Sequence, residues 1–189
     1  SSDSRPASAR RWPYRRLRSW FGAAAGGSSA SRQRAGGSRS SWIARFYVAA
    51  VIDLYSRRVV GWSMKPEMTA QLVTDALMTA LWRRGRAEAL LHHSDRGSQY
   101  TSEQFQRLMA DQGVACSMSR AGNCWDNAAM ESFFSSLKTE RTARKTYRTR
   151  DEAKADVFDY IERFYNPRRR HSTLGYLSPV AFEEQAALA

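Results

Sequence analysis

The sequence contains no apolar run close to the roughly 18 residues that a membrane-spanning helix requires, so it is not expected to cross a membrane. It also lacks a clean apolar segment after its first charges, which makes a secretory signal unexpected. Only two cysteines are present, Cys116 and Cys124, and two cannot form a disulfide framework. These absences favour a reducing, cytoplasmic setting.

Acidic residues are scarce at the beginning of the chain. The 189 residues include 30 Lys or Arg and 18 Asp or Glu, for a net charge of +12, and residues 1–45, with ten arginines and one acid (Asp3), carry +9 of it. The same stretch has no lysine and no glutamate, and 34 of its 45 residues are Ser, Arg, Ala or Gly. Such a composition buries too little apolar surface to offset the entropy of ordering, so residues 1–45 are predicted to be disordered. The arginines there either bind phosphates or stay solvated.

From residue 46 onward the sequence alternates between strand and helix patterns. Residues 46–52 and 58–64 are β-rich runs whose short connection predicts an antiparallel hairpin. Apolar residues at helical spacing follow in residues 73–81. Further strands are predicted at 89–93 and 114–118, and further helices from Thr101, at 127–142 and at 151–165. This order predicts one domain, residues 46–189, with a mixed α/β sheet covered by helices.

Two acidic residues are candidates for chemistry. Asp95 directly follows a buried strand, where α/β sheets present polar groups to ligands, although an aspartate there also simply forms turns. Glu131 flanks the apolar stripe of its helix, and at about 100° per residue Lys138 falls within about 20° of it. Glu131 and Lys138 therefore either line a site or form the solvated edge of an amphipathic helix.

A basic cluster follows the last of these helices. It consists of Arg168, Arg169, Arg170 and His171, with Tyr165 and Tyr176 nearby. Cations interleaved with aromatics suit a surface that binds nucleic-acid phosphates, and solvated arginines are the alternative.

Four long stretches occur in a distinctive order. Residues 53–62 read DLYSRRVVGW, residues 93–100 HSDRGSQY, residues 123–134 NCWDNAAMESFF and residues 165–179 YNPRRRHSTLGYLSP. Together they resemble the catalytic core of bacterial insertion-sequence transposases with a retroviral-integrase-type domain, over about residues 47–182. The resemblance implies an RNase H-like fold and a DDE active site. Such a site cuts DNA strands and joins their 3′ ends to a target, using two divalent ions, Mg²⁺ or Mn²⁺.

The resemblance also implies roles for individual residues. Asp95 matches the second acid and Glu131 the third, which would make both catalytic residues and metal ligands. Lys138 matches the basic residue that contacts a terminal phosphate, and Arg168–His171 would add further DNA contacts. The chemistry agrees, since two metal ions about 4 Å apart stabilise the attacking and leaving oxygens together, and Mg²⁺ prefers oxygen ligands.

The first acid of this family is missing from its place. Residues 37–45, which correspond to the acid-bearing strand, contain no carboxylate. The first strand is therefore predicted to be missing or replaced by the disordered tail, and the abrupt change near residue 45 suggests an N-terminal part that is lost or read out of frame. Asp53 matches a different acid, at the end of the second strand. It either caps the turn, pairs with Arg57 or Arg58, or touches metal.

Three functions remain open on this basis. The first is DNA transposition or integration by a polynucleotidyl transferase, impaired because the first catalytic Asp is absent. The second is an inactive DNA-binding remnant of such a transposase, and the third is a metal-dependent ribonuclease on the same fold. The expected partners are element-end and target DNA, with a homo-oligomer on DNA left open and no membrane, in the cytoplasm and at the nucleoid when DNA is bound.

Overall fold

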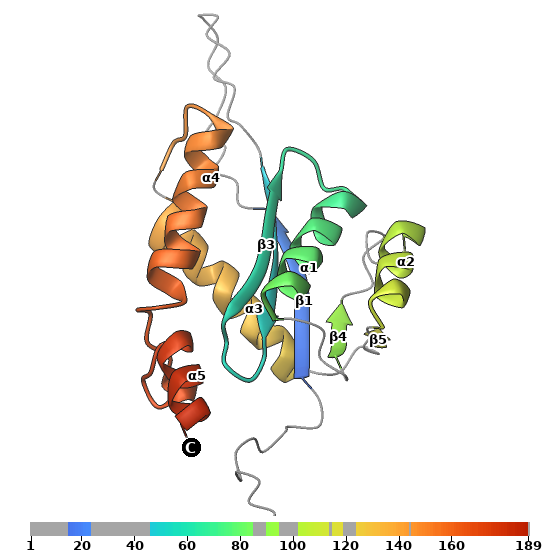
Figure 1. Ribbon diagram of the computed structural model, residues 1–189. Coiled ribbons are helices and arrows are strands. Elements are labelled where there is room, and N and C mark those ends of the chain that lie inside the picture. Colours follow the sequence, from blue (N-terminus) through green and yellow to red (C-terminus); the bar gives the residue numbers. More distant parts are fainter. Residues whose placement is uncertain are drawn as a thin grey trace, which may run out of the picture.

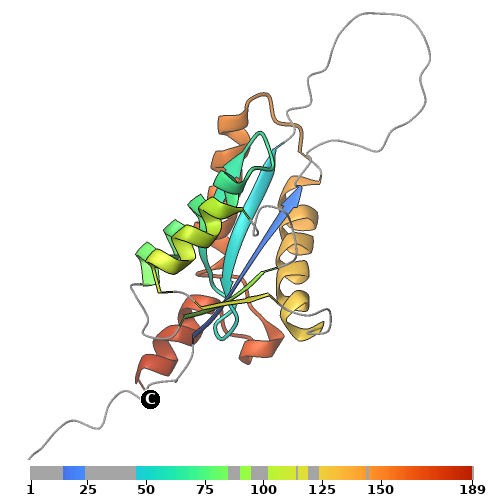
Figure 2. The same ribbon diagram turned by 90° about the vertical axis from the view of Figure 1, so that its right-hand side faces the viewer.

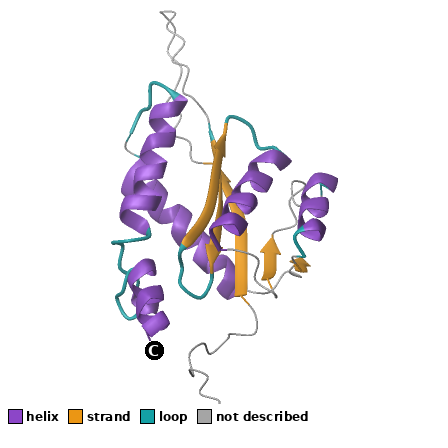
Figure 3. Ribbon diagram, viewed as in Figure 1, coloured by secondary structure: helices purple, strands orange, loops and turns teal. Residues whose placement is uncertain are grey.

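The computed structural model describes residues 15–23, 46–84, 90–94, 102–113, 115–118, 124–143 and 145–188 (Figure 3). The strands are β1 (Arg15–Ala23), β2 (Tyr47–Asp53), β3 (Val59–Lys65), β4 (Leu90–Ser94) and β5 (Ala115–Met118). The helices are α1 (Ala70–Arg84), α2 (Glu103–Asp111), α3 (Cys124–Ser136), α4 (Arg150–Phe158) and α5 (Pro179–Leu188). Two π-helical segments, η1 (Leu137–Thr142) and η2 (Asp159–Tyr165), and a 3-10 turn, η3 (Ser172–Leu174), complete the list. In this described part of the chain, no helix combines the length and apolar character that a membrane span needs.

The five strands form one mixed sheet in the order β3-β2-β1-β4-β5. β1 stands at its centre, antiparallel to β2 and parallel to β4, and β4 is in turn parallel to β5. α1 and α2 lie in the connections that parallel strands require, between β3 and β4 and between β4 and β5. The predicted mixed α/β architecture is confirmed.

The predicted hairpin is present as β2 and β3. Its turn is closed by the Arg57 N–H, which donates to the Asp53 carbonyl at 2.7 Å, and by the Asp53 N–H, which donates to the Arg58 carbonyl at 2.9 Å. Arg57 adopts a left-handed backbone conformation with φ of 61°. A register shift between Val51 and Ile52 adds a bulge just before the turn.

Gly61 allows α1 to lie directly on β3. A Cβ atom at this position would stand 2.6 Å from the Ala80 nitrogen and closer still to the Ala76 carbonyl oxygen. Any side chain would therefore push the helix away from the strand. The glycine explains how α1 comes so close to the sheet.

Helices cover both faces of the sheet (Figures 1 and 2). On one face α1 and α2 enclose a core with the odd-numbered residues of β2, and α3, η1, α4 and η2 enclose a second core with the even-numbered ones. The first core contains Ala49, Val51, Leu72, Leu77 and Phe105. The second contains Val48, Ala50, Ile52, Met130, Phe133 and Tyr160. Because side chains alternate along a strand, β2 contributes to both cores and is buried throughout most of its length.

Helix boundaries differ in detail from the sequence prediction. α2 is capped by Ser102, whose Oγ accepts from the Phe105 N–H at 3.4 Å, instead of by Thr101, which lies outside the described residues. The helix predicted at 127–142 begins at Cys124 and widens into η1 from Leu137. The helix predicted at 151–165 likewise widens into η2.

The prediction for the N-terminal stretch was wrong over nine residues. β1 lies within residues 1–45, which were predicted to be disordered, and it occupies the position of the first strand that was expected to be missing. Strand pairing uses main-chain groups, so a stretch with an unfavourable side-chain composition can still fill the place between β2 and β4. The rest of residues 1–45 lies outside the described part, and the boundary at residue 45 stays a prediction.

Candidate functional site

Two of the strands nearest in sequence or in space to the predicted site, β1 and β4, run side by side. Asp95 lies outside the described residues, directly after the last residue of β4 in the sequence. β1 and β4 are parallel, with Arg18 opposite His93. The pairing of the two strands runs from Arg15 opposite Leu90 to this pair.

Position 20 of β1 lies in the part of the strand that pairs with β2. It pairs with Ala50 of β2, whose side chain lies in the core formed with Met130 and Phe133 of α3. Position 20 is occupied by a tryptophan, and no acid occurs anywhere in β1. The sequence of β1 therefore supplies no carboxylate ligand.

Glu131 and Lys138 are both exposed along α3 and η1. Neither forms a side-chain ion pair with another described residue. The wider π-helical turn begins between them, at Leu137, so the ideal α-helical rotation does not give their relative orientation. Their shared role at a site stays a prediction.

Glu140 lies at the surface and is engaged by two neighbouring side chains. The Tyr160 hydroxyl donates to its Oε2 at 2.7 Å, and Arg169 Nη2 donates to its Oε1 at 2.9 Å. Burial raises the pKa of this carboxyl, but the bonds from Arg169 and Tyr160 outweigh that effect and the net pKa is lowered. Arg169 also donates to the Ser136 Oγ at 2.9 Å, which ties the basic cluster to the end of α3.

The basic cluster divides into residues that face inward and residues that face solvent. Arg169 is held by Glu140, and its guanidinium lies 5.8 Å from the centre of the Tyr165 ring. The His171 ring packs edge-on against Tyr165 at 5.1 Å. Burial, with Arg169 and Arg57 nearby, lowers the pKa of His171 to about 4, so the imidazole is neutral at pH 7. Arg168 and Arg170 are exposed, and neither has an ion-pair partner among the described residues.

Asp53 is fully buried and has a structural partner that the sequence did not indicate. Its Oδ1 accepts from the Tyr55 N–H at 3.0 Å, which is the predicted turn-capping role. Its ion pair is with Arg84 at the end of α1, at 3.3 Å, and not with the predicted Arg57 or Arg58. Sequence spacing could not reveal this pair because α1 ends beside the hairpin turn only in the folded chain.

Arg84 also bonds Glu183 of α5, which fastens the C-terminal helix to the hairpin turn. Glu183 accepts further bonds from the Ser56 hydroxyl at 2.6 Å and from Arg58 Nη1 at 2.7 Å. Burial raises the pKa of Glu183, but the bonds from Arg84, Ser56 and Arg58 prevail and lower it to about 2. α5 itself was not predicted from the sequence.

Asn166 forms a second attachment that sequence reasoning missed. Its Oδ1 accepts from the Val59 N–H and its Nδ2 donates to the Val59 carbonyl, both at 2.9 Å and both buried. Its own carbonyl accepts from the Val180 N–H at 3.1 Å. The only signal was its place in the 165–179 motif, next to arginines that drew attention to charge.

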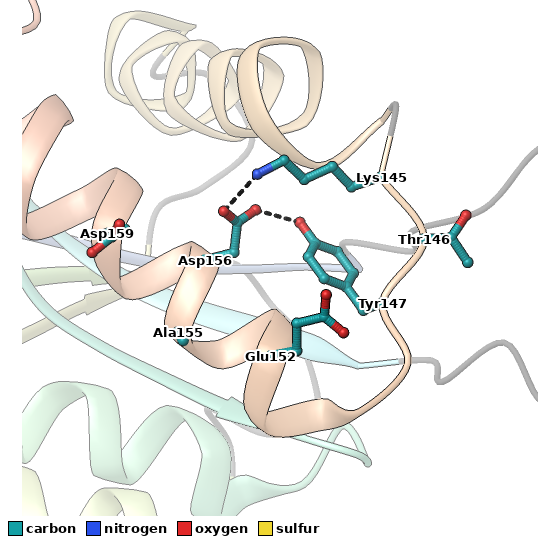
Figure 4. A pocket seen from close by; sticks show the side chains of 7 residues that line it. All are labelled: Lys145, Thr146, Tyr147, Glu152, Ala155, Asp156 and Asp159. Atoms are coloured by element: carbon teal, nitrogen blue, oxygen red, sulfur yellow. Dashed lines mark hydrogen bonds and ion pairs between the residues drawn. The ribbon is translucent and has the colours of Figure 1, made fainter.

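A pocket opens between α4 and the segment before it (Figure 4). It is lined by Lys145, Thr146, Tyr147, Glu152, Ala155, Asp156 and Asp159. Asp156 accepts from Lys145 at 2.7 Å and from the Tyr147 hydroxyl at 2.6 Å, and Arg141 pairs with it at 2.8 Å. Its carboxylate is thus already neutralised and is not available to a ligand cation.

The described residues show no assembled metal site. Among the described residues, no group of three or more His, Cys, Asp or Glu side chains lies together. Glu131 contributes one exposed carboxylate, β1 contributes none, and Asp95 lies outside the described part. The set implied by the resemblance needs three acids, and the described residues supply Glu131 alone among the matched ones.

A five-stranded mixed sheet in this order, with helices on both faces, has the RNase H-like fold. The chain belongs to the integrase core domain family. One model of that domain matches residues 19–124, and a second integrase core domain model matches residues 131–186.

Comparisons with individual proteins agree with this assignment. The transposase InsF for insertion sequence IS3fB of Escherichia coli (strain K12) is 52% identical over 139 residues, which cover 74% of this chain and 48% of the relative. The chain therefore spans about half the length of this relative.

Solved structures share the fold at low sequence identity. A chain of the simian T-cell lymphotropic virus intasome in complex with PP2A regulatory subunit B56 gamma has a TM-score of 0.60 at 12% identity, covering 87% of this chain and 52% of that chain. The HTLV-2 integrase catalytic core domain in complex with magnesium has a TM-score of 0.54 at 10% identity, covering 88% and 94%.

Proposed function

We propose that this chain is the core portion of a DNA transposase, that it binds element-end and target DNA, and that its strand cleavage and strand transfer are impaired. Its relative at 52% identity is a transposase, and its family is the integrase core domain. The observation that carries the impairment is the absence of any carboxylate in β1, the central strand that runs parallel to β4.

The missing carboxylate is expected to reduce activity severely. Phosphoryl transfer depends mainly on positioning and on stabilising charge, and two divalent ions would supply that charge when bound. Asp95 and Glu131 are the residues that would hold them. With two acids instead of three, the ions would be held loosely and in poor geometry, so a large share of the catalytic effect is lost.

DNA binding does not need the missing acid. Lys138, Arg168 and Arg170 are exposed cations without carboxylate partners in the described part, which suits phosphate contacts. Arg169 and His171 belong to the same cluster, but their intramolecular contacts suit a supporting role better. Two copies acting together on paired DNA ends would fit the same function.

Restoring the acid tests the proposal directly. Trp20→Asp introduces a carboxylate into β1, at the position that pairs with Ala50 of β2. We expect no strand transfer by the unmodified chain on element-end DNA with Mg²⁺ or Mn²⁺, and metal binding with at least strand nicking by Trp20→Asp. Adding Asp95→Asn or Glu131→Gln should remove the gain, whereas Glu140→Gln should leave metal binding intact.

Two outcomes would contradict the proposal. Robust strand transfer by the unmodified chain would show that β1 needs no acid, and Asp53 or Asp3 would then be examined as a substitute. Equal loss of Mn²⁺ binding in the Glu131→Gln and Glu140→Gln variants would reject the assignment of Glu131.

The alternative is a catalytically inactive DNA-binding protein that occupies element ends. The absence of an acid in β1 motivates this alternative. It is favoured if Trp20→Asp restores neither nicking nor metal binding. The unmodified chain would then bind element-end DNA, measured by filter binding, and catalyse no reaction on it.

A further inference from the structure

We propose that Tyr176 stacks on an unpaired nucleotide of the bound DNA, with Arg168 and Arg170 contacting the flanking phosphates. This inference rests on the proposed DNA binding and adds a ligand class to it, which is single-stranded nucleotides next to a duplex.

Tyr176 is displayed by a loop whose backbone is firmly held. His171 and Leu177 form an antiparallel bridge, with the His171 N–H donating to the Leu177 carbonyl at 3.1 Å. The Tyr176 N–H donates to the His171 carbonyl at 2.9 Å. Leu174 is buried beneath the loop and anchors it to the protein. An aromatic ring on such a loop can be bound without ordering a flexible segment, which reduces the entropic cost.

The Tyr176 side chain is exposed and its backbone is strained. The residue is 69% exposed, and its φ is 62°, directly after Gly175 with φ of 63°. The left-handed region is unfavourable for a bulky residue, and glycine would occupy it without strain. Among the described residues the Tyr176 ring and hydroxyl have no partner. Folding therefore explains neither the exposure of this ring nor its presence at this position.

Two unpaired cations lie on the same segment. Arg168 and Arg170 are exposed, while Arg169 between them is held by Glu140. Arg170 directly precedes His171, the residue bridged to the Tyr176 end of the loop. Arg168 and Arg170 thus present two guanidinium groups without ion-pair partners among the described residues, and both lie within eight residues of Tyr176 in the sequence.

A stacking ring beside phosphate-binding cations is the arrangement that proteins use for single-stranded nucleic acid. Bases inside a duplex are already stacked on both sides and offer only their edges in the grooves. An unpaired base has a free face, and stacking on tyrosine is tolerant of sequence. The ligand at Tyr176 is therefore an unpaired nucleotide, and the phosphates on either side reach Arg168 and Arg170.

The test compares a blunt duplex with the same duplex carrying a six-nucleotide single-stranded end, by fluorescence anisotropy with the full chain. We expect the overhang to increase affinity by about 5- to 150-fold, the range for stacking one base. Tyr176→Gly should abolish that gain, so that the duplex with the overhang and the blunt duplex bind with equal affinity. This variant suits the backbone conformation, so it is expected to fold, and Tyr176→Phe should retain the gain.

Trp82→Ala is the matched control, because Trp82 is an aromatic residue that is 92% exposed on α1. It should leave the preference for the overhang unchanged. The inference is overturned if Tyr176→Gly keeps that preference, if Trp82→Ala loses it equally, or if the unmodified chain shows none. No binding to either DNA would instead refute the proposed DNA binding itself, so the two failures are distinguishable.

Discussion

Single side chains of the C-terminal segment make contacts whose loss can be measured. Asn166 is the clearest case, because one amide satisfies both the N–H and the carbonyl of Val59 in a buried place. Asn166→Asp keeps the shape but loses the donor, and it places a carboxylate oxygen beside a carbonyl oxygen. We expect this change to lower the free energy of unfolding by about 2–4 kcal/mol in urea titrations.

Gln104→Glu is the matched control for this variant. Gln104 is an exposed amide on α2 that donates to the Gln71 side chain at 2.5 Å. Its replacement should change the free energy of unfolding by less than about 0.5 kcal/mol. Equal effects of the two changes would mean that the Val59 bonds do not stabilise the fold.

The pH dependence of stability should carry the signature of His171. Its pKa is about 4 in the folded chain, lowered by burial and by Arg169 and Arg57, with Glu140 acting in the opposite direction, against an ordinary value of 6.5. Between these values the unfolded chain binds more protons, so stability rises with pH from 4 to 6.5 and falls on acidification. We expect His171→Gln to reduce this slope in denaturant titrations at pH 4–6.5.

Glu183 separates this effect from general acid sensitivity. Its pKa is lowered from 4.5 to about 2, so the stability it contributes is present above pH 4.5 and lost as the pH falls toward 2. Glu183→Gln should flatten the profile in that lower window and leave the slope above pH 5 unchanged. A His171→Gln profile identical to that of the unmodified chain would refute the role of the imidazole.

At the scale of elements, the position of α1 depends on Gly61. In Gly61→Ala the new methyl group would collide with the backbone of Ala76 and Ala80, and neither can move without shifting the helix. We expect a loss of at least about 3 kcal/mol in the free energy of unfolding, or failure to fold. Thermal unfolding followed by circular dichroism measures this loss. Gly113→Ala is a control for backbone strain alone, because its φ is +65° and no atom lies within 4 Å of the new Cβ.

Local patterns predicted some elements better than others. The hairpin of β2 and β3 and the helix α1 followed from residue periodicity and a short connection, which are local signals. β1 could not be predicted because its composition is unfavourable and its stabilising bonds come from strands distant in the sequence. Glu183 and Asn166 were missed for a related reason, since their partners Arg84 and Val59 lie about a hundred residues away. The motifs indicated Asp95 and Glu131 as candidates, and their roles stay predictions.

At the scale of the whole molecule, the charge of +12 predicts salt-sensitive DNA binding. If phosphate contacts dominate, log affinity should fall linearly with log salt concentration. The double change Arg168→Gln and Arg170→Gln removes two of these contacts, so the slope should become shallower by about 1.8. Fluorescence anisotropy on blunt duplex between low and moderate salt measures it.

Arg107→Gln provides the comparison, because Arg107 is an exposed cation on α2 that already pairs with Glu103. Its slope should match that of the unmodified chain. If the double change leaves the slope as it was, the phosphate contacts lie elsewhere, and the arginines of residues 1–45 become the next candidates.

The amide of Asn166 has a consequence for how this chain can associate with others. β3 is the outermost strand on its side of the sheet, and an outer strand normally exposes main-chain groups on which another strand can align. At Val59 those groups are already bound by Asn166, so a foreign strand would first have to displace the C-terminal segment. Asn166 therefore blocks the addition of a strand at this point of the β3 edge, because it already occupies the main-chain groups that a strand would use.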